Sequence, residues 1–189
     1  RVGSESTRRG PERIARLQNP RSRGNLTRQG AACAAGAGKL LGSRVFSPKG
    51  HAELDRVATE LARLGVRVIV VDGGDGTVSD VMSAILHAYP EDRLPALSIL
   101  PSGNTNLIAN DVGCSQRGVE ALQALLLRAQ TGTLLDDVSW RHPVVVSWPD
   151  PGRKPIAGIF RGLAAFTRGT PLRHTRAIVC RSAAVASFV

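Results

Sequence analysis

Long apolar runs are missing from this chain of 189 residues. The longest apolar stretches, such as residues 66–71 with Arg67 inside them, fall well short of the roughly 20 residues that a helix needs to cross a bilayer. Residues 1–16 also lack the apolar centre of a secretory signal peptide. We therefore expect a cytoplasmic protein without a transmembrane segment.

Cysteines and aromatic residues are scarce. The three cysteines, Cys33, Cys114 and Cys180, are odd in number and widely spaced, which fits reduced thiols better than a disulfide framework or a zinc site. Aromatic residues make up 4% of the chain, so few side chains could stack on single-stranded nucleic acid. The composition therefore predicts no specific nucleic-acid partner.

Lysine is rare as well, and the net charge of +10 comes almost wholly from arginine. A basic surface attracts phosphates, which leaves nucleotides, nucleic acids and anionic membranes open as partners. A general preference for arginine and alanine would give the same charge without any partner. We expect any membrane association to be peripheral, at the inner membrane face, and to weaken with salt.

The N-terminal third of the chain is irregular. Residues 1–13 have no apolar period and predict a disordered leader, whereas residues 14–17 are a short strand candidate. The turn-rich segment NPRSRGN follows at 19–25. The alanine-rich residues 31–41 contain glycines and predict either a poor helix or a loose connection, and residues 45–46 predict a second small strand.

A regular alternation of helix and strand begins at residue 51. Apolar residues recur at spacings of three and four through residues 51–64, which predicts a helix that Gly65 ends. Residues 66–71 are almost all β-branched, as in a strand buried on both faces of a parallel sheet. A further strand and a further helix are predicted at 97–100 and 117–129.

This order of elements predicts an α/β fold with an open, mostly parallel sheet flanked by helices, a Rossmann-like arrangement in three layers. We expect a nucleotide-binding domain over residues 14–133 and a partial β-rich region over residues 134–189. The latter either adds strands to the first domain or begins a second domain that is incomplete. Its predicted strands lie in LLDDVSW, in PVVVSW and at residues 156–166.

The most informative segment is VIVVDGGDGTVSDVM at residues 68–82, where a glycine-rich turn joins the buried strand to a helix. Three glycines in five residues let the backbone adopt positive φ and approach a ligand without Cβ collisions, so that several N–H groups converge on a phosphate. Thr77 can cap the helix, and Asp80 completes a capping-box spacing. Asp75 is unusual because a carboxylate repels phosphate unless a divalent cation or a transferring proton accounts for it.

The glycine-rich segments allow two other interpretations. A plain strand-to-helix turn is the alternative for residues 73–77, but an Asp and a Thr within the turn favour phosphate chemistry. GAGKLLG at 36–42 is not a Walker loop, because Cys33 stands in place of the first glycine and Leu40 in place of the Ser or Thr that ligates Mg²⁺.

Four segments carry a resemblance to one family. GGDGTV at 73–78 matches the family's nucleotide turn, and NPRSRG at 19–24 is similar to its Asn-Pro-x-Ser-Gly strand exit. FSPKGHAEL at 46–54 is similar to its Thr-x-x-x-Gly-His-Ala helix start, and PSGNTNLIANDVG at 101–113 resembles its Pro-x-Gly-Thr-x-Asn-Asp segment. Over residues 14–140 the chain thus resembles the catalytic domain of the diacylglycerol kinase family, which includes sphingosine kinases and is more distantly similar to NAD kinases.

The resemblance implies a lipid kinase domain that uses ATP and Mg²⁺ and transfers the γ-phosphate to a lipid hydroxyl such as that of diacylglycerol. It implies a nucleotide site made by residues of four loops: Asn19, Ser47, Gly73, Gly74, Asp75, Gly76, Thr77, Asn104, Thr105 and Asn106. Asp75 would act on the metal or on proton transfer. The chain departs from the family pattern where Arg23 replaces a small residue, Asn104 a Thr and Leu107 an Asp.

The resemblance also implies a C-terminal β-rich domain that covers the lipid and supplies a further catalytic acid. That domain is not complete in this sequence, so we expect a fragment whose lipid substrate lies at an anionic membrane surface. A kinase of a soluble acceptor such as NAD and a non-catalytic nucleotide-binding remnant stay open as alternatives. The oligomeric state is open too, with a homodimer among the options.

Overall fold

The computed structural model describes residues 14–159, apart from residues 137, 139 and 151. The expected leader at residues 1–13, and the part of the expected strand at 156–166 beyond residue 159, lie outside the described residues.

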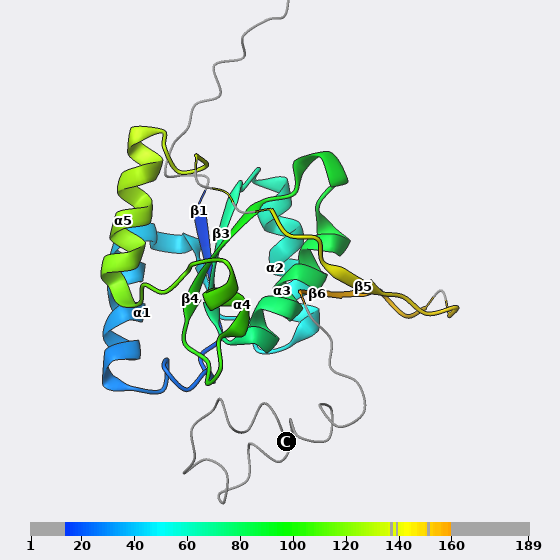
Figure 1. Ribbon diagram of the computed structural model, residues 1–189, viewed down its shortest axis with the longest axis horizontal. Helices are drawn as coiled ribbons and strands as arrows, with labels where there is room; N and C mark the ends of the chain where they lie inside the picture. Colours follow the sequence, from blue (N-terminus) through cyan, green and yellow to red (C-terminus); the bar gives the residue numbers. More distant parts are fainter. Residues whose placement is uncertain (1–13, 137, 139, 151, 160–189) are drawn as a thin grey trace, which may run out of the picture.

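A four-stranded parallel sheet forms the centre of the molecule (Figure 1). Its strands are β1 (Ile14–Gln18), β2 (Val45–Phe46), β3 (Val68–Gly73) and β4 (Ala96–Pro101). Their order in space is β2-β1-β3-β4, and all neighbours are parallel. Every residue of β1 and β3 is buried, as expected for strands with helices on both faces.

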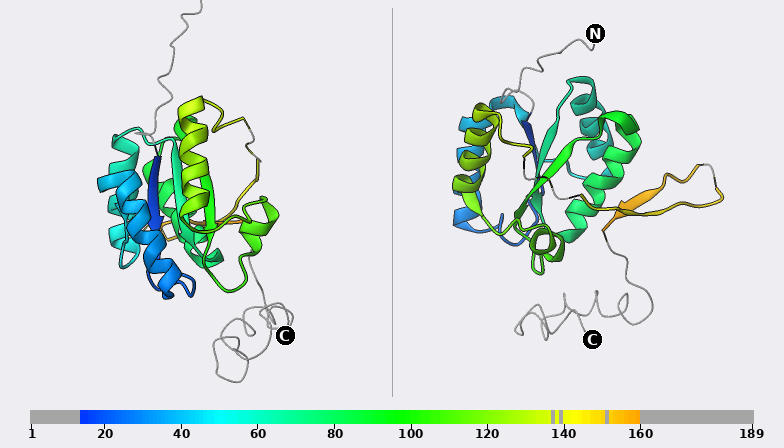
Figure 2. Two further views of the ribbon diagram at one scale, coloured as in Figure 1. Left: turned by 90° about the vertical axis from the view of Figure 1, so that its left-hand side faces the viewer. Right: turned by 45° about the horizontal axis from the view of Figure 1, so that its top comes forward.

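Helices cover both faces of the sheet, which confirms the predicted three layers (Figure 2). α1 (Arg28–Leu41) and α5 (Gly118–Thr131) lie on one face, and α2 (His51–Arg63) and α3 (Asp75–Ala88) lie on the other. Successive residues of β3 supply the two cores in turn, because side chains alternate across a strand. The predicted end of α2 is confirmed by Gly65, whose φ is 67°.

The alanine-rich segment forms the continuous helix α1 and is not a loose connection. Oγ1 of Thr27 accepts a hydrogen bond of 3.0 Å from the N–H of Gly30, which caps the helix. A Cβ on Gly36 would lie 2.6 Å from Cγ2 of Val119, so glycine at this position lets α1 and α5 approach closely. The low helix propensity of the segment is therefore offset by tertiary packing.

Short helical turns complete the layers. The 3₁₀ helices Gly42–Arg44 and Glu91–Arg93 precede β2 and β4, and α4 (Leu107–Asp111) follows β4. None of the helices in the described part of the chain has both the length and the apolar character needed to span a membrane.

An antiparallel pair, β5 (Val144–Val146) and β6 (Ile156–Gly158), follows the sheet and extends away from the α2–α3 face (Figure 1). β6 is held against α3 by two side-chain hydroxyls. Oγ of Ser79 donates to the carbonyl of Ala157 at 2.7 Å, and Oγ of Ser83 accepts from the N–H of the same residue at 2.9 Å.

The strand predicted in LLDDVSW is wrong for the residues of that segment that the structure describes. The chain leaves α5 at Gly132, whose φ is 77°, and the N–H of Asp136 then bonds to the carbonyl of Thr133 at 3.3 Å to form a turn. Adjacent leucines followed by aspartates lack the period of two that a half-buried strand needs.

Candidate functional site

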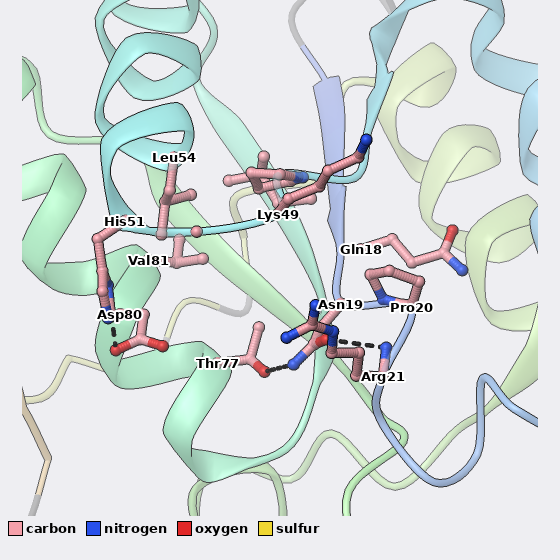
Figure 3. Close-up of a pocket in the computed structure, with 13 residues that line it drawn as sticks. Gln18, Asn19, Pro20, Arg21, Lys49, His51, Leu54, Thr77, Asp80 and Val81 are labelled. Carbon is pink, nitrogen blue, oxygen red and sulfur yellow. Dashed lines mark hydrogen bonds and ion pairs between the residues drawn. The ribbon is translucent and has the colours of Figure 1, made fainter.

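The predicted site lies where the chain changes direction across the sheet. From β1 the chain passes to β2 on one side, and then through α2 to β3 on the other side of β1. Such a switch point opens a crevice beyond the carboxyl ends of the two strands, where ligands bind in open α/β sheets. A cavity of about 250 Å³ lies there, between the loop after β1 and the first turns of α2 and α3 (Figure 3).

The turn at residues 73–77 differs from expectation in how it uses glycine. None of its three glycines has a positive φ. Gly73 is needed for space, because a Cβ there would lie 2.4 Å from the Cβ of Thr77. Gly76 has open space around it, with no heavy atom within 4 Å of an added Cβ. The turn is therefore compact at its start and open at Gly76.

The helix after the turn also begins earlier than predicted. α3 starts at Asp75, and its N-cap is Gly74, which has no side chain, so Thr77 is not the cap. The first helical hydrogen bond runs from the N–H of Val78 to the carbonyl of Gly74 at 3.1 Å. The N–H groups of the three residues before Val78 therefore have no partner within the helix and are available to an anion.

Thr77 instead contacts the loop after β1. Nδ2 of Asn19 donates to Oγ1 of Thr77 at 2.9 Å, and Oδ1 of Asn19 accepts from the N–H of Arg21 at 3.0 Å. Figure 3 shows this pair at one end of the cavity. The structure thus brings together two predicted site residues that are 58 positions apart in the sequence.

The carboxylate of Asp75 joins the turn to the segment after β4. Its Oδ1 accepts from the N–H of Ile108 at 2.9 Å, at the start of α4. The other oxygen, Oδ2, has no hydrogen-bond partner among the described residues, and the side chain is half-buried. One carboxylate oxygen of Asp75, the predicted metal ligand, therefore bonds to the segment after β4, and the second oxygen is free to bind a cation.

The turn at residues 102–106 packs directly on the 73–77 turn. Asn106 has a left-handed backbone with φ of 53°, and its side chain bonds both the N–H and the carbonyl of Gly103, at 2.9 and 3.0 Å. Asn106 is buried and its amide is used within its own turn, whereas Asn104 is exposed and Thr105 half-buried. The predicted contacts of these residues with nucleotide stay predictions.

Only part of the predicted set borders the cavity. Asn19 and Thr77 line it, whereas Ser47, exposed at the end of β2, and the 102–106 turn do not. The 73–77 turn reaches the cavity only through Thr77. The predicted site residues are therefore spread from this cavity across the N-terminus of α3.

Four polar residues outside the predicted site set also line the cavity: Arg21, Lys49, His51 and Asp80. Nδ1 of His51 lies 3.9 Å from Oδ1 of Asp80, and both side chains are largely exposed. The sequence signal for Arg21 and Lys49 was their position in loops that follow strands. In a chain with 25 lysines and arginines, this position alone did not distinguish them from the other basic residues.

A buried ion pair lies directly behind the glycine-rich turn. Arg16 of β1 donates to Asp72 of β3, and both side chains are buried. Nη1 of Arg16 also donates to the carbonyl of Cys33 at 3.3 Å. Burial raises the pKa of the Cys33 thiol, and the positive charge of Arg16 only partly opposes this effect. A charged residue within each of two apolar strands was the sequence signal for this pair.

A metal ion at this site would depend on the nucleotide. The described residues contain no group of three or more His, Cys, Asp or Glu side chains that could hold a metal ion by themselves. Mg²⁺ in phosphate-transfer sites is usually bound by one or two carboxylates together with phosphates and waters. The single carboxylate of Asp75 fits such a site.

Comparisons with known proteins point to one family. The model of the diacylglycerol kinase catalytic domain matches residues 15–134. A probable lipid kinase YegS-like protein of Chromohalobacter salexigens is 37% identical over 86 residues, which cover 43% of this chain and 27% of that protein. The probable lipid kinase YegS of Escherichia coli O1:K1 / APEC is 37% identical over 86 residues, which cover 46% of this chain and 28% of the relative.

A solved structure of a diacylglycerol kinase from Bacillus anthracis str. Sterne is also similar, with 24% identity and a TM-score of 0.48. The match covers 64% of this chain and 40% of that one. The chain matches less than a third of the length of the two curated relatives.

Proposed function

Because the chain belongs to the diacylglycerol kinase catalytic domain family, we propose that it is the ATP-binding part of a lipid kinase. Kinases of this family use ATP. Residues 73–77 would hold the phosphates of ATP, and the γ-phosphate would pass to a lipid hydroxyl such as that of diacylglycerol. The observation that carries the proposal is the hydrogen bond between Asn19 and Thr77, because it joins two family motifs at the cavity.

The phosphates would be held by main-chain groups. The N–H groups of Asp75, Gly76 and Thr77 precede the first helical bond of α3, and the helix dipole adds positive potential at the same end. The open space at Gly76 lets a phosphate approach the backbone without meeting a Cβ. Arg21 and Lys49 at the cavity add positive charge that favours the same ligand.

Asp75 would hold Mg²⁺, which neutralises phosphate charge when bound. Its bond to Ile108 fixes the orientation of the carboxylate, so Oδ2 keeps one position relative to the N-terminus of α3. A fixed carboxylate loses little freedom when it binds a cation, which favours binding.

The acceptor would be a lipid at an anionic membrane surface, reached peripherally from the cytoplasm. The net charge of +10 supports attraction to such a surface. The acceptor and the catalytic base stay open for this chain, which matches less than a third of the length of the two curated relatives. The proposal includes no specific nucleic-acid partner and leaves a homodimer open.

A transfer assay tests this function. The 189-residue chain is incubated with Mg²⁺ and γ-labelled ATP, and the acceptors are vesicles with diacylglycerol, vesicles with sphingosine, and NAD in solution. Label in a lipid supports the proposal, and the Thr77→Val variant, which keeps the shape but removes the hydroxyl, should transfer less. Label in NAD alone would overturn the lipid assignment, and binding of ATP without transfer to any acceptor would indicate a nucleotide-binding remnant.

A further inference from the structure

Asp72 is the last side chain before the glycine-rich turn, and its charge is buried. The residue is 2% exposed, and its ion-pair partner Arg16 is 0% exposed. A buried carboxylate is stable only when its oxygens are paired, and here Arg16 occupies one of them, Oδ2. The other oxygen faces a residue outside the sheet.

That residue is Asn25, in the loop after β1. Its Nδ2 donates to Oδ1 of Asp72 at 3.0 Å and to the carbonyl of Asn19 at 2.9 Å. An amide nitrogen carries two hydrogens, so both bonds can form at once. Asn25 therefore links the buried charge to the first residue of the loop.

The link fixes Asn19 from two sides. The N–H of Asn19 donates to the carbonyl of Asp72 at 2.9 Å, and its own carbonyl accepts from Asn25. With its main chain held in this way, the side chain of Asn19 points to Thr77 at the cavity (Figure 3). Asn25 does not line the cavity, so any effect on a ligand there must act through other residues.

We propose that Asn25 is a positioning residue for the nucleotide site, anchored on Asp72 and acting through Asn19. The buried Arg16–Asp72 ion pair anchors this link. Asn25 connects the ion pair to the loop after β1 through its bonds to Asp72 and to the carbonyl of Asn19. The inference rests on the proposed nucleotide function. It predicts that Asn25 sets affinity for ATP without touching it.

The test is a double-mutant cycle on binding of a fluorescent ATP analogue with Mg²⁺ to the full 189-residue chain. Asn25→Ala leaves the Arg16–Asp72 pair in place and should weaken binding by up to about tenfold, the limit in which the whole contribution of one hydrogen bond to a charged group is lost from binding. In an Asn19→Ala background the same substitution should change binding less than about twofold, because the Asn19 side chain through which Asn25 acts is gone. Leu26→Ala, at the next and largely exposed position, is the matched control and should bind like the unsubstituted chain.

A merely structural role gives a different pattern. It would lower the melting temperature and weaken binding by the same factor in both backgrounds, which would overturn the inference. A second readout is the side-chain amide resonance of Asn19, which should shift in Asn25→Ala and stay in place in Leu26→Ala. An unmoved resonance, or unchanged affinity in Asn25→Ala, would overturn the positioning role of Asn25 but not the proposed function. An unsubstituted chain that does not bind the analogue would overturn the proposed function as well.

Discussion

Gly103 and Gly74 touch backbone to backbone, since a Cβ on Gly103 would lie only 2.4 Å from the Cα of Gly74. The two residues belong to turns after neighbouring strands, β3 and β4, whose carboxyl ends pair through Gly73 and Pro101. The contact sets the distance between the 73–77 turn and the 102–106 turn. Asp75 adds a bond from the first turn to the start of α4, so the two turns form one unit.

Gly103→Ala should separate these turns. The new methyl group overlaps main-chain atoms that cannot rotate away, and we expect a loss of about 1–3 kcal/mol in the free energy of unfolding, measured by urea denaturation, together with weaker ATP binding. Gly38→Ala is the matched control, because it lies in α1 with open space around it, and it should stabilise the protein by about 0.5–1 kcal/mol. Equal stability of both variants would contradict the contact.

Asp75→Asn should keep the fold and lose the response to magnesium. The asparagine oxygen can still accept from the N–H of Ile108, but the charge that attracts a cation is gone. Mg²⁺ should raise the affinity of the unsubstituted chain for an ATP analogue, and this gain should be absent in the variant. Asp92→Asn, an exposed position remote from the turn, controls for the change in net charge. A magnesium response that survives in Asp75→Asn would refute the metal role.

Arg16→Met should be among the most damaging single substitutions. It leaves the carboxylate of Asp72 buried without its cation, which costs about 3–5 kcal/mol of unfolding free energy. Adding Asp72→Asn to it removes the unpaired charge and should recover a large part of the loss. The exposed Arg67 provides the control, and Arg67→Met should change stability by less than about 0.5 kcal/mol. Additive effects of the two substitutions would show that the pair is not coupled.

Tyr89 should make the protein sensitive to alkali. Burial raises the pKa of its phenol from 10.0 to about 12, and the hydroxyl has no hydrogen-bond partner among the described residues. Between these values the unfolded chain loses the proton and the folded chain keeps it, so rising pH favours unfolding by about 1.4 kcal/mol per pH unit. Tyr89 is the only tyrosine, so near-ultraviolet tyrosinate absorbance reports its ionisation directly.

Tyr89→Phe is the control for this effect. Its unfolding free energy, compared between about pH 9 and about pH 11, should lack the part of the alkaline loss that Tyr89 causes. Parallel losses in both proteins, or ionisation of the folded phenol near its ordinary pKa, would count against the assignment.

The central sheet could be predicted from the sequence because its signals are local. β3 is a run of β-branched residues, and α2 carries its apolar residues on one face, so both were found close to their observed bounds. The helix α1 was left undecided because its formation depends on Gly36 fitting against Val119, a contact 83 positions away in the sequence, which no local pattern contains.

The candidate site was predictable in its location and less so in its contacts. A glycine-rich turn after a buried strand was sufficient to locate it, because parallel strands place such turns at one edge of the sheet. The cap at Gly74 and the bond from Asn19 to Thr77 depend on how three loops meet. Asn25 was missed for the same reason, since its partner Asp72 lies 47 positions away.

The most direct test of the nucleotide site is an amide-resonance titration of the isotope-labelled chain with a non-hydrolysable ATP analogue and Mg²⁺. We expect saturable shifts that are largest for the N–H groups of Asp75, Gly76 and Thr77 and for the side-chain amide of Asn19. Saturable binding that leaves these four signals unmoved, or no binding at millimolar analogue, would contradict this expectation.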